Sequence, residues 1–305
     1  RSPSRGLGDV YKRQEEYCQK IKYVNDDKWG WLTTLHILDL DSLDIEDKGV
    51  YYGASFFHLD QKSNYMIYNT YTSVGQKTGL IRDDESQIKL IDGRISSSLH
   101  MKEYGDDLHL FSWGFRDGSS YYVLDRSLEE VSVIKDIAPR ESIQAVRFNK
   151  DYSYLMTFLR VDPLFVFSLD EQKLPELVGE LKFPGEPRYL QEIDESSLVS
   201  LGRSPFGELE LSLFNVSMPT EPIRTSRLKL SDYGWRFIFH HKNIIIYKKH
   251  LLIKGPSEYY LVQAVGDKLI LKKEIELLGE TRSFFKDNKL YIKDGRLWEE
   301  IDLDD

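Results

Sequence analysis

Pairs of alternating apolar residues recur through this chain at a nearly constant spacing, and a short polar turn usually precedes each pair. The pairs return about every 45 residues. They start at Tyr65/Ile67, Leu108/Leu110, Tyr154/Met156, Leu198/Ser200, Ile244/Ile246 and Leu290/Ile292. Such alternation is typical of a β-strand with one buried face, and this period is that of a four-stranded propeller blade.

The residues between these pairs form further short apolar segments separated by turns. In the stretch that begins near Arg94, the segments SSSLHM, LHLFSW, SYYVLD and EEVSVI are separated by turn residues such as Gly-Asp-Asp and Asp-Gly. From Val50 onward almost no segment shows the period of a helix. The sequence therefore predicts an all-β fold, a β-propeller of four-stranded antiparallel blades, with about six blades in this chain.

Residues 15–305 are predicted to form one propeller domain. The last blade contains only about three strands, and the unpaired edge that this leaves is a liability for a sheet. The strand-like segment WLTTLHILDL at residues 31–40 has no complete blade before it, so we expect it to complete the last blade. The predicted blades cover approximately residues 50–92, 94–136, 141–182, 187–230, 234–277 and 281–303.

The first fourteen residues, RSPSRGLGDVYKRQ, differ from the rest of the chain. They are polar and basic, lack any period and end abruptly before acidic, aromatic sequence. The string resembles translated adapter sequence at the end of a reading frame assembled from environmental DNA. We expect residues 1–14 to be non-native and the true N-terminus to lie upstream of Glu15; a genuine disordered tail is the alternative.

Composition narrows the classes of partner. Aromatic residues make up 13% of the chain, which suits strands, and the net charge of −9 disfavours binding to a phosphate backbone. The single cysteine, Cys18, cannot form an internal disulfide. No apolar run reaches the roughly 18 to 20 residues of a membrane span. We expect a monomer that binds no nucleic acid and has no transmembrane segment in this chain.

Three segments carry a resemblance to a known family. They are YYVLDRSLEEVSVIKDIAPRESIQAVRFNKDYSYLMTFLRVDPLFVFSLDEQKLPELVGELKFPG at 121–185, LSLFNVSMPTEPI at 211–223, and DNKLYIKDGRLWEEIDL near the end. In order and spacing they resemble the secreted bacterial β-propeller family whose C-terminal domain is distantly related to WD-40 repeats. The resemblance implies an exported protein, secreted or anchored at the envelope, with a signal sequence upstream. The family is defined by fold, so no activity follows from it.

Two short motifs contain candidate binding residues. Arg160 and Asp162, in the string RVDPLF, are candidates for a ligand-holding loop, although an Arg/Asp pair beside a proline also braces a hairpin. Asp232 and Trp235 lie in SDYGWRF, where members of the family usually have a Gly-Asp-Arg-Gly-like turn. At this turn the chain therefore departs from the pattern of the family.

The chain shows no established catalytic or metal-binding motif. His240 and His241 are adjacent, and neighbours on a strand point to opposite faces, so the two cannot chelate one ion without a bulge. Gly-x-Ser-x-Gly is absent, and we expect no cofactor and no metal. The sequence favours a non-enzymatic exported scaffold that binds a protein or a glycan. The alternative is a glycosidase-like hydrolase with carboxylates of at least two blades converging at the central funnel.

Overall fold

The computed structural model describes residues 21–23, 32–52, 56–60, 62–72, 75–82, 88–115, 117–158, 162–170, 174–232, 243–255, 257–277, 281–295 and 297–303. Regular structure in these ranges consists of strands and one short 3-10 helix, η1 (Ser98–His100). The chain divides into two compact units. Unit 1 contains Arg1–Gly114 and Ser120–Ile134, and unit 2 contains Phe115–Ser119 and Lys135–Asp305.

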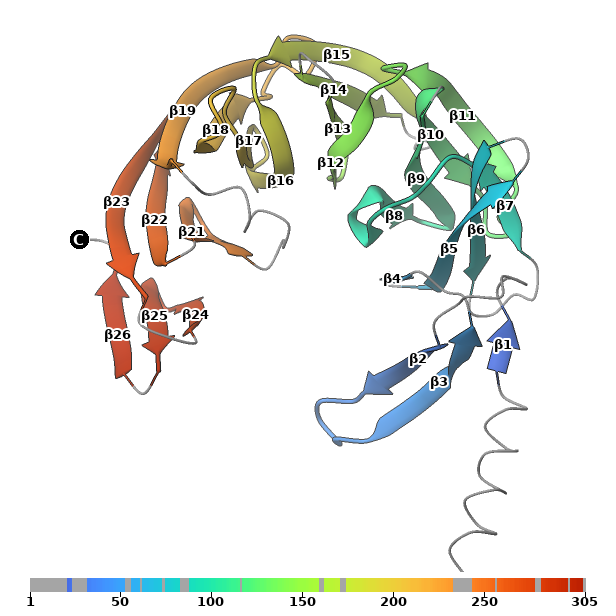
Figure 1. Cartoon of the computed structure of the whole chain (residues 1–305), viewed down its shortest axis with the longest axis horizontal. Helices are drawn as coiled ribbons and strands as arrows, with labels where there is room; N and C mark the ends of the chain where they lie inside the picture. Colours follow the sequence, from blue (N-terminus) through green and yellow to red (C-terminus); the bar gives the residue numbers. More distant parts are fainter. Residues whose placement is uncertain are drawn as a thin grey trace, which may run out of the picture. The chain divides into compact units, whose positions relative to one another are not determined.

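Unit 1 begins with a three-stranded sheet in the order β1-β3-β2, in which β2 and β3 form an antiparallel hairpin and β1 runs parallel to β3. Two four-stranded sheets follow, and in each of them the strands lie in sequence order (Figure 1). The boundary between the units passes through β10 and β11. The strands are β1 (Ile21–Tyr23), β2 (Leu32–Leu38), β3 (Ile45–Tyr52), β4 (Phe56–Leu59), β5 (Asn64–Thr72), β6 (Gly75–Arg82), β7 (Lys89–Asp92), β8 (Met101–Tyr104), β9 (Asp107–Gly114), β10 (Gly118–Leu124) and β11 (Glu130–Ile137).

Unit 2 contains three four-stranded sheets and a final sheet of three strands, again in sequence order within each sheet. Neighbouring strands of these sheets are antiparallel. The strands are β12 (Ser142–Phe148), β13 (Tyr152–Phe158), β14 (Asp162–Leu169), β15 (Pro175–Phe183), β16 (Glu186–Asp194), β17 (Ser197–Arg203), β18 (Leu209–Asn215), β19 (Ile223–Ser231), β20 (Ile244–Tyr247), β21 (His250–Lys254), β22 (Glu258–Val265), β23 (Lys268–Glu276), β24 (Thr281–Lys286), β25 (Lys289–Asp294) and β26 (Leu297–Asp302).

The recurring apolar pair lies on the second strand of its sheet, and one of the six predicted pairs was assigned to the wrong strand. Five of the predicted pairs lie on β5, β9, β13, β17 and β25, and each of their residues is at most 3% exposed. Ile244 and Ile246 instead lie on β20, the first strand of its sheet. The equivalent pair is Leu251/Ile253 on β21, and both residues are fully buried. The segment KHLLIKG is therefore a regular second strand.

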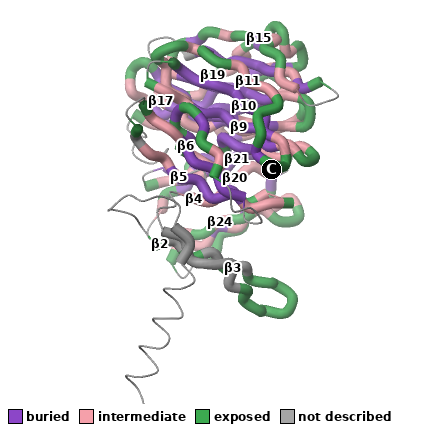
Figure 2. Tube along the Cα trace, turned by 90° about the vertical axis from the view of Figure 1, so that its right-hand side faces the viewer, coloured by how far each residue is buried: buried purple, intermediate pink, exposed green. Residues whose placement is uncertain are grey.

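Burial explains why the alternating apolar residues are most regular on the second strand of each sheet. In Figure 2 buried residues follow β9 and β10, and the same middle position is held by β21 and β22 in unit 2. The fourth strand of a sheet is an edge with one face toward solvent; β23, for example, is largely exposed. Middle strands are largely buried because, within each unit, their side chains pack against those of a neighbouring sheet.

The sheets of each unit also contact one another through their first hairpins. In unit 1 the Lys62 ammonium lies 2.9 Å from the Asp106 carboxylate of the next sheet. In unit 2 the Lys249 ammonium lies 3.7 Å from the Asp194 carboxylate, and that of Lys248 lies 3.1 Å from the Asn288 side-chain oxygen. Since these contacts repeat at the same turn, they follow from the repeat itself.

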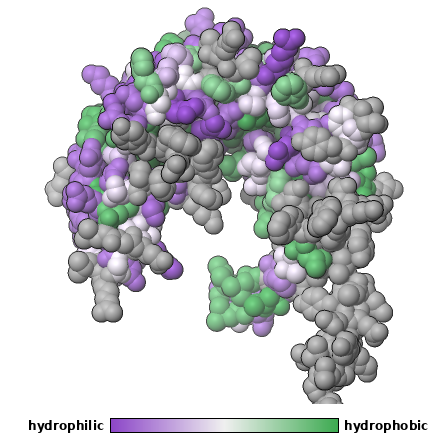
Figure 3. Space-filling view, viewed as in Figure 1, coloured by the Kyte–Doolittle hydropathy of each residue, from purple (hydrophilic) through white to green (hydrophobic). Residues whose placement is uncertain are grey.

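The hairpin β2–β3 contains most of the segment 31–40. The hairpin belongs to the β1-β3-β2 sheet, in which β2 is an edge strand. The predicted start of the first blade at residue 50 is therefore too early, because β3 of this separate sheet ends at Tyr52 and the four-stranded sheet begins with β4 at Phe56. Apolar residues gather at the exposed tip of the hairpin (Figure 3); they are Leu38, Leu40, Leu43 and Ile45. Completion of the last sheet by residues 31–40 stays a prediction, as does the single domain at 15–305.

Gly202 on β17 permits close pairing with β16. A Cβ at this position would lie 2.4 Å from the Glu186 carbonyl oxygen and 2.6 Å from the Pro187 Cα. Both atoms belong to the backbone and cannot rotate away. We expect Gly202→Ala to lower the free energy of unfolding by about 2–3 kcal/mol in urea titrations, because the strands must separate.

Gly266 provides the control for this prediction. It has a φ of +55°, and a Cβ there would meet nothing within 4 Å. Gly266→Ala should therefore cost only the left-handed backbone penalty of about 1 kcal/mol. Equal costs for the two variants would contradict the close approach at Gly202.

Candidate functional site

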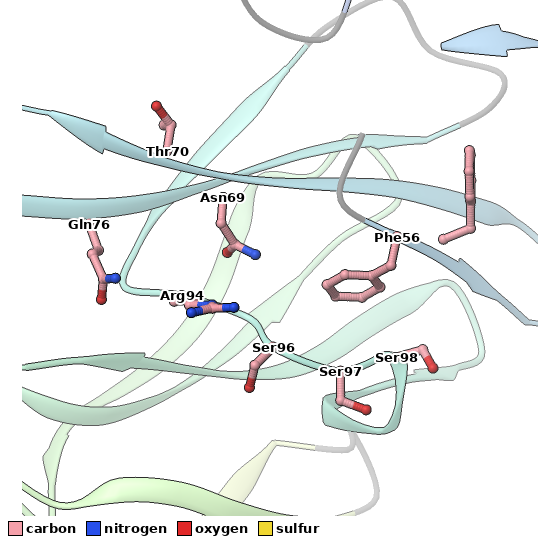
Figure 4. Close-up of a pocket in the computed structure, with 9 residues that line it drawn as sticks. Phe56, Asn69, Thr70, Gln76, Arg94, Ser96, Ser97 and Ser98 are labelled. Atoms are coloured by element: carbon pink, nitrogen blue, oxygen red, sulfur yellow. The ribbon is translucent and has the colours of Figure 1, made fainter. Parts of the chain in front are cut away.

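A cavity of about 550 Å³ lies at one end of the β4–β7 sheet in unit 1. Its lining comes from the start of β4, the end of β5, the start of β6 and the connection that leads from β7 to β8. Figure 4 shows Arg94, Ser96, Ser97 and Ser98 following one another along this connection, with Asn69 and Phe56 facing them from β5 and β4. The lining residues are Phe56, Phe57, Asn69, Thr70, Gln76, Arg94, Ser96, Ser97 and Ser98.

The backbone at Arg94 is held by the neighbouring sheet. Arg94 donates its N–H to the Trp113 carbonyl at 2.7 Å and accepts the Trp113 N–H at 3.0 Å. Gly93 has a φ of +84°, and a Cβ there would lie 2.9 Å from the backbone of Trp113. A glycine is needed because the conformation and the close approach both exclude a side chain. The position of Arg94 is thus set by β9 of the next sheet.

Two side chains, those of Asn69 and Thr78, hold Ile95, the residue between Arg94 and Ser96. The Asn69 amide donates to the Ile95 carbonyl at 2.8 Å, and its oxygen accepts the Ile95 N–H at 3.2 Å. The Thr78 hydroxyl also accepts that N–H, at 3.1 Å, and is itself fully buried. Since both backbone groups of Ile95 are satisfied, the connection has little freedom, and its flanking side chains are presented in fixed positions.

The three serines continue this wall. Ser97 caps the short helix η1 by accepting the Leu99 N–H at 3.2 Å. The backbone of Ser98 hydrogen-bonds His58, whose Nε2 lies 3.3 Å from the Asp60 carboxylate. Burial lowers the pKa of His58, and the nearby Asp60 charge opposes this shift in part.

His100 ends η1 and is almost completely buried. Its Nδ1 has no hydrogen-bond partner in the described part of the chain. Burial lowers the pKa of His100 to about 4 because the charged imidazolium would lose its hydration. The ring is therefore a neutral packing group beneath the connection at neutral pH.

The electrostatics of the cavity centre on Arg94. Its side chain is exposed, and no described residue makes an ion pair or a side-chain hydrogen bond with its guanidinium. Asp92, two positions earlier, is paired with Lys77 across the β6–β7 ladder. The charges of that pair cancel locally, and no described residue of the lining carries a negative charge that would offset Arg94. Such a group can bind an anion through a planar array of donors.

A second, smaller cavity of about 360 Å³ lies at the opposite turns of the unit 1 sheets. Its two carboxylates, Glu103 and Asp106, flank a single hairpin, β8–β9. Glu103 accepts the Tyr65 hydroxyl at 2.7 Å, and Lys62 pairs with Asp106. The hydrogen bond and charge of Lys62 lower the pKa of Asp106. These carboxylates serve the contact between sheets.

Of the candidate residues, the structure describes Asp162 and Asp232, and neither lines either cavity. Arg160 and Trp235 lie outside the described residues, as do His240 and His241. Asp162 begins β14, where its backbone pairs with Phe183. Asp232 follows β19, and its carboxylate lies 2.6 Å from the Lys229 ammonium. All four candidate site residues stay predictions.

Sequence reasoning missed the Arg94 cavity. The one local signal was the run Arg94-Ile95-Ser96-Ser97-Ser98, in which a cation precedes three hydroxyls. The partners that fix this run, Asn69 and Trp113, are remote in sequence and could not be assigned to it. No group of three or more metal-binding side chains occurs among the described residues, and none of their helices is long and apolar enough to cross a membrane.

The repeat and the sheet order agree with a comparison to known families. A sequence profile of the Beta propeller domain family matches residues 10–263, more than half of the chain. This chain belongs to the Beta propeller domain family. The predicted fold class is thereby confirmed, and each four-stranded sheet is a propeller blade. The predicted foreign origin of residues 1–14 stays untested.

Two curated relatives of this propeller chain carry the name of uncharacterized proteins. It is 34% identical over 205 residues to an uncharacterized protein of Archaeoglobus fulgidus, a match that covers 66% of this chain and 32% of the relative. It is 29% identical over 228 residues to the uncharacterized protein MJ1554 of Methanocaldococcus jannaschii, with 70% and 36% covered. The chain thus spans about a third of the length of these curated relatives.

The solved structures that match this propeller chain share only 10% identity with it. Apo AztD from Citrobacter koseri has a TM-score of 0.49, with 86% of this chain and 74% of that chain covered. The computationally designed Ika8 protein also has a TM-score of 0.49, with 88% and 92% covered.

Proposed function

We propose that this propeller is a non-enzymatic binding module of an exported bacterial envelope protein, and that the Arg94 cavity holds its protein or glycan ligand. One observation carries the proposal: the backbone on both sides of Arg94 is fixed, while its guanidinium has no partner among the described residues. A rigid, concave site with an unpaired donor array has the features of a binding pocket.

The lining supports binding over chemistry. The described residues around the cavity are two phenylalanines, two amides, four hydroxyl side chains and Arg94, so none of them is a carboxylate, a histidine or a cysteine. Hydroxyls and amides satisfy the hydrogen bonds of a ligand and orient it. Acid–base catalysis would need a titrating group within reach of the ligand.

The first experiment is a binding screen with two matched variants. The whole chain, Arg94→Gln and Arg282→Gln are tested against an array of immobilised glycans and against immobilised envelope proteins. Arg282 is also exposed, and it does not line the cavity. We expect a ligand whose binding is weakened by Arg94→Gln and unchanged by Arg282→Gln. Equal binding by all three chains would refute the cavity as the ligand site.

The hydrolase remains the alternative proposal. A hydrolase needs two carboxylates whose pKa values differ, and Glu192 and Asp194 come nearest to this requirement. Burial raises the pKa of Glu192. Burial acts in the same direction on Asp194, but hydrogen bonds from the adjoining turn outweigh it and lower the pKa of Asp194. Both residues lie on β16, however, whereas the alternative requires carboxylates of two blades. Release of reducing sugar from a glycan substrate, lost in Glu192→Gln, would favour this alternative.

Export is proposed from the family resemblance of the sequence. Its test is expression of the full-length gene followed by cell fractionation. Recovery of the protein in the envelope or medium is the expected result, and recovery in the cytoplasm alone would refute it.

A further inference from the structure

We propose that the Arg94 cavity recognises the carboxylate of an acidic sugar, a hexuronate unit within a glycan. This inference rests on the proposed binding function and specifies its ligand. It is built from the charge of Arg94, the hydroxyl side chains beside it and the aromatic ring that faces them (Figure 4).

Arg94 matches a single carboxylate. A guanidinium presents parallel N–H donors that bind the two oxygens of one carboxylate, and such charge-assisted pairs are the stronger hydrogen bonds. Among the described residues of the lining, Arg94 is the one cation. Phosphate groups, which carry between one and two negative charges at neutral pH, are usually held by clusters of arginines. One guanidinium therefore favours a monoanion.

The serines suit the hydroxyl groups of a sugar ring. Ser96 is exposed and Ser98 half-buried, and both line the cavity next to Arg94. A hydroxyl side chain both donates and accepts, as each sugar hydroxyl does, so the two can pair in either direction. Thr70 adds a hydroxyl from the end of β5. The polar lining thus offers partners for several ring substituents at once.

Phe56 supplies an apolar face. Its ring is half-buried at the start of β4 and faces the connection that carries the serines. One face of a pyranose ring consists largely of C–H groups, and burying it against an aromatic ring removes apolar surface from water. A flexible acidic side chain of a protein has no such flat face. The combination of ring and hydroxyls therefore favours a sugar over a protein carboxylate.

The net negative charge of the chain favours a glycan with few negative charges. The chain carries a net charge of −9, which repels polyanions. A glycan with isolated uronate units among neutral sugars experiences less of this repulsion than a polyuronate. The cavity volume of about 550 Å³ also lies within the range of about 300–1,000 Å³ of pockets for small ligands. We therefore infer recognition of one uronate with part of a neighbouring sugar.

The test uses a disaccharide that ends in glucuronate, its methyl ester and the disaccharide that ends in glucose. Titration calorimetry with the whole chain should show binding of the acid. Loss of the charge in the ester should weaken binding roughly 10- to 100-fold, because a hydrogen bond to a charged group is lost. Raising the salt concentration should weaken binding of the acid and leave that of the glucose disaccharide unchanged.

Variants locate the bound group. Arg94→Gln should reduce affinity for the acid to that for the ester, whereas Arg282→Gln should bind the acid as the wild type does. Ser96→Ala should weaken both sugars by a factor of roughly 2 to 10, since a neutral hydrogen bond is removed. Unchanged thermal midpoints show that the variants are folded, because the contacts that fix Arg94 involve its backbone.

Failure of this inference is distinguishable from failure of the proposed function. Equal affinity for acid and ester, or binding of the acid unaffected by Arg94→Gln, overturns the uronate assignment. If an envelope protein binds instead and Arg94→Gln abolishes that binding, the cavity is a binding site for a protein, and only the assignment of its ligand is overturned. If Arg94→Gln changes no binding to any glycan or protein, both proposals are wrong.

Discussion

Replacement of Phe214 by alanine should lower the free energy of unfolding by about 3–5 kcal/mol. Phe214 lies on β18, is fully buried and packs against Phe183 of β15 with ring centroids 5.0 Å apart. It therefore joins the β12–β15 blade to the β16–β19 blade within unit 2, in a cluster that includes Leu198 and Val216. Truncation removes buried apolar surface and leaves a cavity between two sheets that cannot collapse independently.

Phe206 is the matched control for this prediction. It occupies the β17–β18 turn of the same blade and is 85% exposed. Phe206→Ala should change stability by less than about 0.5 kcal/mol. Urea unfolding of the whole chain measures both variants. A loss of under about 1 kcal/mol in Phe214→Ala would show that this inter-blade core is not tightly packed.

Acidification should destabilise the protein through His100 by up to roughly 3 kcal/mol between pH 6.5 and pH 4. Burial lowers the pKa of His100 to about 4, below its usual value of 6.5. Above pH 6.5 the ring is neutral in both states, so it adds no pH dependence. Between the two values the unfolded chain binds a proton that the folded chain excludes, which favours unfolding; below pH 4 the loss is constant.

His100→Leu isolates this effect from other titrating groups. The variant cannot bind the proton, so its stability should fall less steeply than that of the wild type between pH 6.5 and 4. The difference between the two curves is the quantity of interest, because His58 and the carboxylates titrate in both proteins. Parallel curves would mean that His100 is accessible to water and titrates normally in the folded protein.

Much of the fold could be predicted because its signals are local. Alternation along a strand and polar turns between strands depend on neighbouring residues alone, and the repeat multiplies each signal. The exception is informative. Ile244/Ile246 and Leu251/Ile253 both alternate, and only the pairing of β20 with β21 and of β21 with β22 shows which strand is second.

The candidate site could not be predicted in the same way. The candidate residues were chosen from the sequence because they lie in polar turns or where the chain departs from a family pattern. A turn motif does not show whether a cavity lies beside it. Arg94 has no motif of its own. Its importance depends on Trp113 in the next blade and on Asn69 on β5, which hold the connection in place.

The sequence alone determined the class of secondary structure, the length of the repeat and the propeller fold, because these follow from local alternation and turn chemistry. The tertiary structure decided which strands form the middle of each blade, which glycines allow close approach, and where a cation has no partner among the described residues. These properties arise from contacts between residues that are remote in sequence, and burial and unsatisfied charge exist only once such contacts form.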